Sequence, residues 1–270
     1  MRELATRTVS GLLYAAIIIA GVYFHPYGLL ALLAVILTAG LVEFKHLVKA
    51  SDSSSIFSTI NVLGVFLLWA HLRFTQDFQN HLVAFLVMLI TAIIVQWLFA
   101  GTKKKLDVLP LYKAFLGIIY IFLPLALAIS IVFNKGYWQP YFLIAIFLFL
   151  WANDTFAYLT GMAIGKHKLI PHISPKKTIE GLMGGIIGTL LTAYVISHFW
   201  TDLDLLHLLV LGALVAASGT IGDLFESALK RAADVKDAGN LIPGHGGILD
   251  RLDSFLISVP VAYFYLHFFA

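Results

Sequence analysis

Apolar runs of roughly 18 or more residues recur along the whole chain, and this pattern constrains the fold more than any other feature of the sequence. Each run is long enough to cross the hydrocarbon core of a bilayer as an α-helix. Of the 270 residues, 60% are hydrophobic and 12% are charged, so polar side chains are too few to cover a water-soluble domain. We therefore predict an all-α, polytopic membrane protein without a soluble domain.

Nine membrane spans can be placed along the chain, and short breaks with turn or capping residues, such as "HPYG" and "ASDSSS", separate them. The predicted spans cover residues 9–24, 28–48, 56–72, 81–100, 112–133, 140–161, 179–199, 204–230 and 252–269. No small-residue cleavage site follows the first span, so we expect it to be retained as a helix. We divide the chain into residues 1–135, with five spans and no recognised motif, and residues 136–270, with four spans and the chemistry-bearing residues.

The distribution of basic residues predicts the orientation of these spans. With the N-terminus in the cytoplasm, all but two of the 18 Lys and Arg residues fall in inner segments, and the exceptions are Arg73 and Lys135. This positive-inside bias favours nine spans, because eight or ten would break the alternation. The basic residues are spread over several loops, so we expect no nucleic-acid partner. The absence of cysteine excludes disulfides and thiolate metal sites.

Polar residues gather in inner segments of the second half. The sixth span ends in "FLWANDTFAYLTG", the next loop reads "KHKLIPHISPKKTIEG", and the eighth span ends in "SGTIGDLFESALKR". A charge within a span usually faces a cavity or a partner, because lipid does not solvate it. Helical spacing places two of the acids on stripes with neighbours: Asp154 with Tyr158 and Gly161, and Asp223 with Glu226, Ser227 and Lys230. We expect all three segments to reach the same membrane face.

Four carboxylates in these regions predict a site for a hard cation. Asp250 and Asp253 are three residues apart at the start of the ninth span, so both side chains point the same way. Together with Asp154 and Asp223, they offer oxygen ligands on helices, which suit Mg²⁺. Zinc would require His or Cys, and only His245 lies nearby in the sequence. The alternative is that the acids at the ninth span only stabilise the first turn of a helix.

The segment "PGHGG" predicts a second element, a loop that binds phosphate. Its glycines, Gly244, Gly246 and Gly247, allow backbone amides to approach an anion closely. The alternative for His245 is an ordinary loop residue. We interpret the segment as a loop that binds an anion.

The segment "HISPKKT" predicts a further anion site at the start of span seven. We expect Ser174 as the N-cap and Pro175 as the first helical residue, which places Lys176 and Lys177 in the first turn. Free N–H groups and the positive end of the helix dipole attract anions there. The alternative is that the two lysines only determine topology. Acids for a metal and bases for phosphates together favour phosphoryl or nucleotidyl transfer.

The stretch "SALKRAADVKDAGNLIPGHGGILDRLD" closely resembles the signature of the phosphatidate cytidylyltransferases, also called CDP-diacylglycerol synthases. The segments "NDTFAYLTG" and "SPKKTIEG" also look like segments of that family, so the resemblance covers roughly the second half of the chain. The positions that match the signature are Ser227, Lys230, Arg231, Lys236, Asp237, Gly239, Pro243, His245, Gly246, Gly247, Asp250, Arg251 and Asp253.

The resemblance implies that the chain converts CTP and phosphatidate into CDP-diacylglycerol and pyrophosphate with Mg²⁺. On this hypothesis the metal ligands are Asp223, Asp250 and Asp253, with Asp154 as a further metal or supporting group. The groups expected at the substrates are Lys230, Arg231, Lys176, Lys177, Lys236, Arg251, Ser174, His245, Gly246 and Gly247. For Lys230 and Arg231, as for the other lysines, a topological role is the alternative. We also expect Gly184, Gly185 and Gly188 to permit close helix packing.

Two other functions have to be weighed against this one. A CTP-dependent lipid kinase of the polyprenol type would need similar groups but would release CDP instead of pyrophosphate. A transporter would carry charges across the bilayer, whereas the charges here gather at one face.

We expect a bacterial plasma membrane protein with its site on the cytoplasmic side. The sequence leaves open the acyl-chain preference, a second cation and a homodimer.

Overall fold

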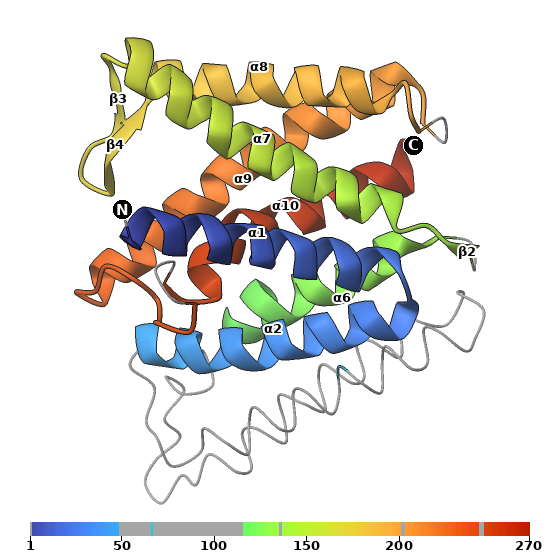
Figure 1. Ribbon diagram of the computed structural model, residues 1–270, viewed down its shortest axis with the longest axis horizontal. Coiled ribbons are helices and arrows are strands. Elements are labelled where there is room, and N and C mark those ends of the chain that lie inside the picture. Colours follow the sequence, from blue (N-terminus) through green and yellow to red (C-terminus); the bar gives the residue numbers. More distant parts are fainter. Residues whose placement is uncertain (1, 49–65, 67–115, 135–136, 201–202, 243–245) are drawn as a thin grey trace, which may run out of the picture. The chain divides into compact units, whose positions relative to one another are not determined.

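The computed structural model describes residues 2–48, 66, 116–134, 137–200, 203–242 and 246–270 (Figure 1). The described chain is dominated by helices and divides into two compact units. The first unit comprises Met1–Gln139 and Val235–Arg251, and the second comprises Pro140–Asp234 and Leu252–Ala270. The boundary after Gln139 lies close to the predicted division after residue 135. The segment Val235–Arg251, however, belongs with the N-terminal part of the chain.

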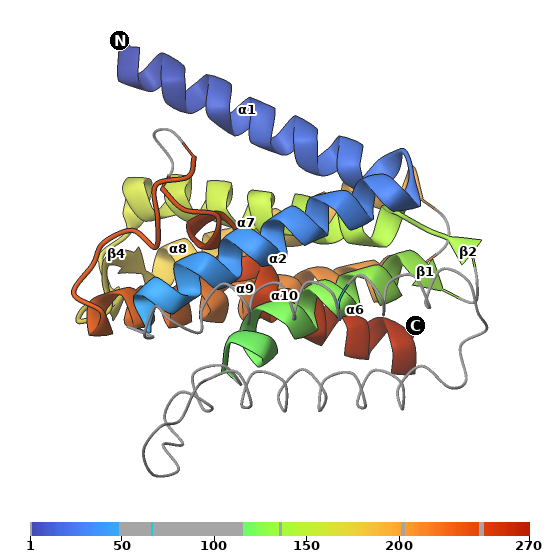
Figure 2. The same cartoon turned by 90° about the horizontal axis from the view of Figure 1, so that it is seen from below.

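The first unit is built on two long helices that precede a π-helical segment. Its elements are α1 (Arg2–Tyr23), α2 (Pro26–Leu47), η3 (Ile118–Phe122), α6 (Leu123–Val132) and a hairpin of β1 (Phe133–Asn134) and β2 (Tyr137–Trp138). His25 begins α2, because its Nδ1 accepts a hydrogen bond from the Tyr27 N–H at 3.2 Å and Pro26 supplies a preset helical φ. From this short connection α1 and α2 diverge (Figure 2).

The second unit contains the remaining helices. Its elements are α7 (Tyr141–Ile164), β3 (Lys168–Ile170), β4 (Ser174–Thr178), α8 (Ile179–Ile196), α9 (Leu205–Ala232) and, from Leu252 onward, α10 (Leu249–Phe268). The strands β3 and β4 pair antiparallel and form a hairpin at one end of α7 and α8 (Figure 1). This hairpin carries the two lysines of the "SPKKT" segment.

Glycines allow α8 to pack directly against α7. Added Cβ atoms on four glycines of α8 would collide with α7: Gly181 with the carbonyl oxygen of Ala157, Gly184 with Thr160, Gly185 with Asn153 and Gly188 with Phe156. Small residues of this spacing lie on one helix face and let two backbones approach closely. The predicted packing role of Gly184, Gly185 and Gly188 is confirmed.

Small and hydroxyl residues also join α9 to α10 inside the second unit. A Cβ on Gly222 would lie 2.5 Å from the carbonyl oxygen of Asp253. The hydroxyl of Ser218 donates to that of Ser258 at 3.1 Å, and Ser258 donates to the carbonyl oxygen of Val215 at 3.2 Å. Such hydrogen bonds link helices where no water is present to compete. They bring the carboxylate-bearing parts of α9 and α10 together.

The helices of the described residues agree with the predicted spans. Spans 9–24, 28–48, 140–161, 179–199, 204–230 and 252–269 correspond to α1, α2, α7, α8, α9 and α10, and the described part of span 112–133 to η3 and α6. Spans 56–72 and 81–100 lie outside the described residues. By length and composition, α2, α7, α8 and α9 can cross a membrane, whereas Val9–Tyr23 and Ile118–Val132 are shorter apolar helices. The chain is therefore membrane-embedded, while the count of nine spans and the orientation stay predictions.

The described chain is dominated by helices, in agreement with the predicted all-α class, and it also contains two short hairpins. One expectation about local structure is wrong. Ser174 is not a helix N-cap: it begins β4, and α8 starts only after Thr178, whose hydroxyl accepts a hydrogen bond from the Gly181 N–H at 3.1 Å. A residue before proline is biased toward extended backbone, which suits a strand as well as a cap. Lys176 and Lys177 consequently lie on a strand and not in a first helical turn.

The packing of α8 on α7 predicts that Gly185→Ala destabilises the protein. The added methyl group would collide with the buried Asn153 side chain and with its backbone oxygen. We expect a loss of about 1–3 kcal/mol in the free energy of unfolding, as for overpacked cores. Thermal unfolding in detergent measures this loss. Gly28→Ala in α2 is the matched control, because its Cβ would make only ordinary contacts of 3.4 Å and longer, and an equal loss there would contradict the prediction.

Candidate functional site

A cavity of about 390 Å³ lies in the second unit, among α7, the β3–β4 hairpin, α8, α9 and α10. Its volume falls in the range of small-ligand pockets. Its polar lining consists of Asn153, Asp154, Tyr158, Lys176, Lys177, Thr178, Thr220, Asp223 and Ser254, beside apolar side chains such as Met162, Leu169 and Leu182. The end of span six, the following loop and the end of span eight therefore meet at one place, as predicted.

Carboxylates from α7, α9 and α10 lie near one another in the second unit, and two of them, Asp154 and Asp223, line the cavity. Asp253 of α10 interacts electrostatically with Asp223 and Glu226 of α9 and with Asp154 of α7. Like charges held this close repel one another, and the repulsion grows as water is excluded. The cluster therefore favours positively charged partners.

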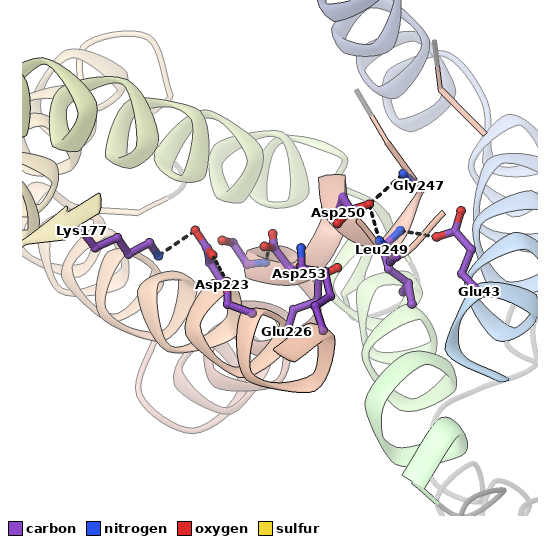
Figure 3. Close-up of polar contacts among 12 residues, drawn as sticks. Glu43, Lys177, Asp223, Glu226, Gly247, Leu249, Asp250 and Asp253 are labelled. Carbon is purple, nitrogen blue, oxygen red and sulfur yellow. Dashed lines mark hydrogen bonds and ion pairs between the residues drawn. The ribbon is translucent and has the colours of Figure 1, made fainter. Parts of the chain in front are cut away.

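Lysines pair with two of these carboxylates, and Figure 3 shows the pair of Lys177 and Asp223. Lys177 Nζ lies 2.6 Å from Asp223 Oδ2, and Ser227 Oγ donates to Asp223 Oδ1 at 3.2 Å. Lys230 Nζ lies 2.5 Å from Oε2 of Glu226, whose side chain is 0% exposed. Lys230 thus compensates a buried charge from one helical turn away, and its expected contact with a substrate phosphate stays a prediction.

The same carboxylates match Mg²⁺ in the kind of donor they offer, since hard oxygen ligands are what this ion prefers. Within the described ranges, no group of three or more His, Asp or Glu side chains is close enough together to hold a metal ion. Asp223 is instead paired with Lys177. The metal role of Asp154, Asp223 and Asp253 stays a prediction, supported by donor chemistry and by mutual repulsion.

The rest of the signature lies in the first unit and forms a loop that leads into α10. Asp250 Oδ2 accepts hydrogen bonds from the N–H groups of Ala238 and Gly247, both at 2.8 Å. The N–H of Gly246 donates to the carbonyl oxygen of Ile242 at 3.1 Å, and Gly246 has a φ of 88°, which favours glycine. The N–H groups of Gly246 and Gly247, which we expected to bind a phosphate, therefore donate hydrogen bonds to acceptors of the same segment.

The other predicted site residues are less constrained. Arg231, Lys236 and Arg251 are exposed, and Ser174 is half-buried at the start of β4. Gly244 and His245 lie outside the described residues. The substrate roles of these residues stay predictions.

Sequence reasoning missed Glu43, which contacts this loop from α2. The N–H groups of Ile248 and Leu249 donate to its Oε1 and Oε2, each at 2.9 Å (Figure 3). Glu43 lies inside the predicted span 28–48, and a carboxylate within an apolar span was a signal that a partner existed. Glu226 was placed on the correct stripe but was given no role.

Comparison with known proteins identifies the family. A family model described as the cytidylyltransferase family matches residues 5–269. The phosphatidate cytidylyltransferase of Haemophilus influenzae is 32% identical over 273 residues, which cover 94% of this chain and 95% of that protein. Those of Bacillus subtilis and Staphylococcus haemolyticus are 48% and 46% identical over 122 residues, or 45% of this chain and 45% and 47% of those proteins. Because the family match covers nearly every residue, this chain belongs to the cytidylyltransferase family.

Proposed function

We propose that this chain is a membrane-embedded phosphatidate cytidylyltransferase, which makes CDP-diacylglycerol and pyrophosphate from CTP and phosphatidate in phospholipid biosynthesis. The observation that carries the proposal is the match over 94% of the chain to a protein of that name. Four described helices that can cross a membrane agree with a lipid substrate.

The two substrates require a site that is open to both lipid and water. The acyl chains of phosphatidate stay in the bilayer, whereas CTP arrives from the aqueous phase. The cavity of the second unit combines carboxylates and lysines with apolar side chains, and it is lined by helices that can cross a membrane. The positive-inside bias supports a location of this site at the cytoplasmic face of a bacterial inner membrane.

In the proposed reaction, a phosphate oxygen of phosphatidate attacks the α-phosphorus of CTP. The bond between the α-phosphorus and the oxygen that leads to the β-phosphate breaks, and pyrophosphate leaves with that oxygen. Both reactants are anions, so the site must neutralise charge and hold them in line. Lys176 and Lys177 line the cavity, which supports a role for both in binding these phosphates. Exposed Arg231, Lys236 and Arg251 add positive charge that attracts both substrates.

The carboxylates would hold the cation. Asp154, Asp223 and Asp253 are the proposed ligands in the second unit, and the metal role of Asp250, which lies in the first unit, stays a prediction. Bound Mg²⁺ would neutralise the charge that develops on the reacting phosphates and on the leaving pyrophosphate. The pairing of Lys177 with Asp223 places a phosphate-binding group beside a proposed metal ligand.

Product identification tests the function directly. Purified protein in detergent, given phosphatidate, Mg²⁺ and CTP labelled in either the α- or the γ-phosphate, should release labelled pyrophosphate from γ-labelled CTP. The α-label should pass into lipid. Release of CDP with transfer of the γ-label to lipid would overturn the proposal in favour of a lipid kinase.

Replacement of Asp223 by Asn should abolish the reaction in folded protein. The amide keeps the size of the side chain but loses the charge that binds Lys177 and the proposed cation. We expect turnover to fall by about 100-fold or more, as when a principal electrostatic group is removed. Asp204→Asn at the other end of α9 is the control, because Asp204 is an exposed N-cap and Asn caps equally well. Near-normal turnover by Asp223→Asn would contradict the assignment.

Replacement of Lys177 by Met should lower the reaction rate without unfolding the protein. Met fills similar space but offers no cation to a phosphate or to Asp223. We expect kcat/KM to fall about 10- to 100-fold, the size of one charge-assisted contact of about 1.5–3 kcal/mol. Lys168→Met on β3 serves as the control, since Lys168 is exposed and does not line the cavity. Equal effects of the two substitutions would refute a specific role for Lys177.

A further inference from the structure

We propose that Glu43 of α2 is a positioning residue for the reaction, because its buried carboxylate holds the signature loop and the start of α10 in their working arrangement. This inference rests on the proposed function. It assigns a role in the reaction to the N-terminal part of the chain, which carries no recognised motif.

The contact consists of two well-formed hydrogen bonds. Glu43 is 7% exposed, and its two carboxylate oxygens accept from the backbone N–H groups of Ile248 and Leu249, each at 2.9 Å. The first N–H groups of a helix lack partners within the helix and carry partial positive charge. The carboxylate of Glu43 therefore caps α10 across more than 200 residues of sequence.

Two glycines of the signature are shaped to this carboxylate. A Cβ on Gly239 would lie 2.5 Å from Glu43 Oε1, and a Cβ on Gly247 would lie 2.5 Å from Glu43 Oε2. Any side chain at either position would push the carboxylate off the backbone amides. The structure thus explains both glycines by the approach of Glu43, whereas the sequence alone suggested the approach of a phosphate for Gly247.

A second carboxylate, that of Asp250, also accepts hydrogen bonds from the backbone of the signature loop. Asp250 Oδ2 accepts from the N–H groups of Ala238 and Gly247, both at 2.8 Å. Gly247 is thus in contact with both acids. Because Asp250 follows Leu249 directly, a shift of the N–H groups held by Glu43 would move a proposed metal ligand.

Stability alone does not account for a buried carboxylate here. Apolar residues of similar volume often replace buried charges with no loss of stability, so a charge retained in an apolar helix is better explained by what it positions. Gln would keep the volume of Glu43 but could accept only through one oxygen, and its NH₂ group would face one of the two backbone N–H groups.

The test compares Glu43→Gln with wild-type protein in detergent. We expect kcat/KM for CTP to fall about 10- to 100-fold, as for residues that orient a metal site from outside it. KM for phosphatidate and the thermal unfolding midpoint should change little. Hydrogen exchange should speed up at the amides of Ile248 and Leu249. His46→Gln is the control, because His46 is an exposed polar residue one turn of α2 away, and it should behave as wild type.

The exchange measurement separates the two proposals. If the wild type releases no pyrophosphate, the proposed function fails, while faster exchange at Ile248 and Leu249 would still support the hold on the loop. Wild-type kinetics and exchange in folded Glu43→Gln would overturn the inference, and so would a lowered unfolding midpoint with unchanged kcat and KM. If Glu43→Gln does not fold, Gly247→Ala replaces it, because the added methyl group displaces the same carboxylate, and the same result is expected.

Discussion

A carboxylate among apolar helices needs a partner, because neither lipid nor a packed core solvates its charge. This constraint organises the described polar residues of the chain. Asp223 is paired with Lys177, Glu226 with Lys230, and Glu43 and Asp250 with backbone N–H groups. The pairings of Asp223, Glu43 and Asp250 tie separate segments of the chain together, whereas Glu226 and Lys230 pair within α9.

The partners fall into two kinds with different consequences. A lysine partner has a long side chain that carries its own charge, so the pair of Lys177 and Asp223 could rearrange if ions bound in the cavity. A backbone partner is part of a fold element, and moving it moves a loop. The carboxylates held by lysines therefore suit direct contact with ligands, whereas Glu43 and one oxygen of Asp250 hold the loop itself.

Glycine has three separate uses in this chain. On α8, glycines let two helices touch, as the sequence predicted from their spacing. At Gly246, a positive φ requires the residue. At Gly239 and Gly247, the missing side chains leave room for the carboxylate of Glu43. A run such as "PGHGG" does not distinguish these uses, because all three produce the same letter in the sequence.

Much of the site could be predicted from spacing alone. The stripe of Asp223, Glu226, Ser227 and Lys230 on α9 was correct, because helical periodicity decides which side chains share a face. The meeting of α7, the "SPKK" segment and α9 at one cavity followed from topology. The cap at Ser174 was wrong, because a Ser-Pro pair suits a strand and a helix start equally well, and the antiparallel partner β3 is what selects the strand.

By itself, the sequence determined that the chain is made of apolar helices, where the described ones other than α1 begin and end to within a few residues, and which residues resemble a nucleotidyl-transfer signature. These are local properties, because helix length, periodicity and motif spacing are all contained in contiguous segments. Only the tertiary structure decided that Glu43 holds the signature loop and that Lys177 of β4 pairs with Asp223 of α9. The physical reason is that a partner for a buried charge is chosen by proximity in space, and the spacing of residues along the chain does not encode the distance between helices.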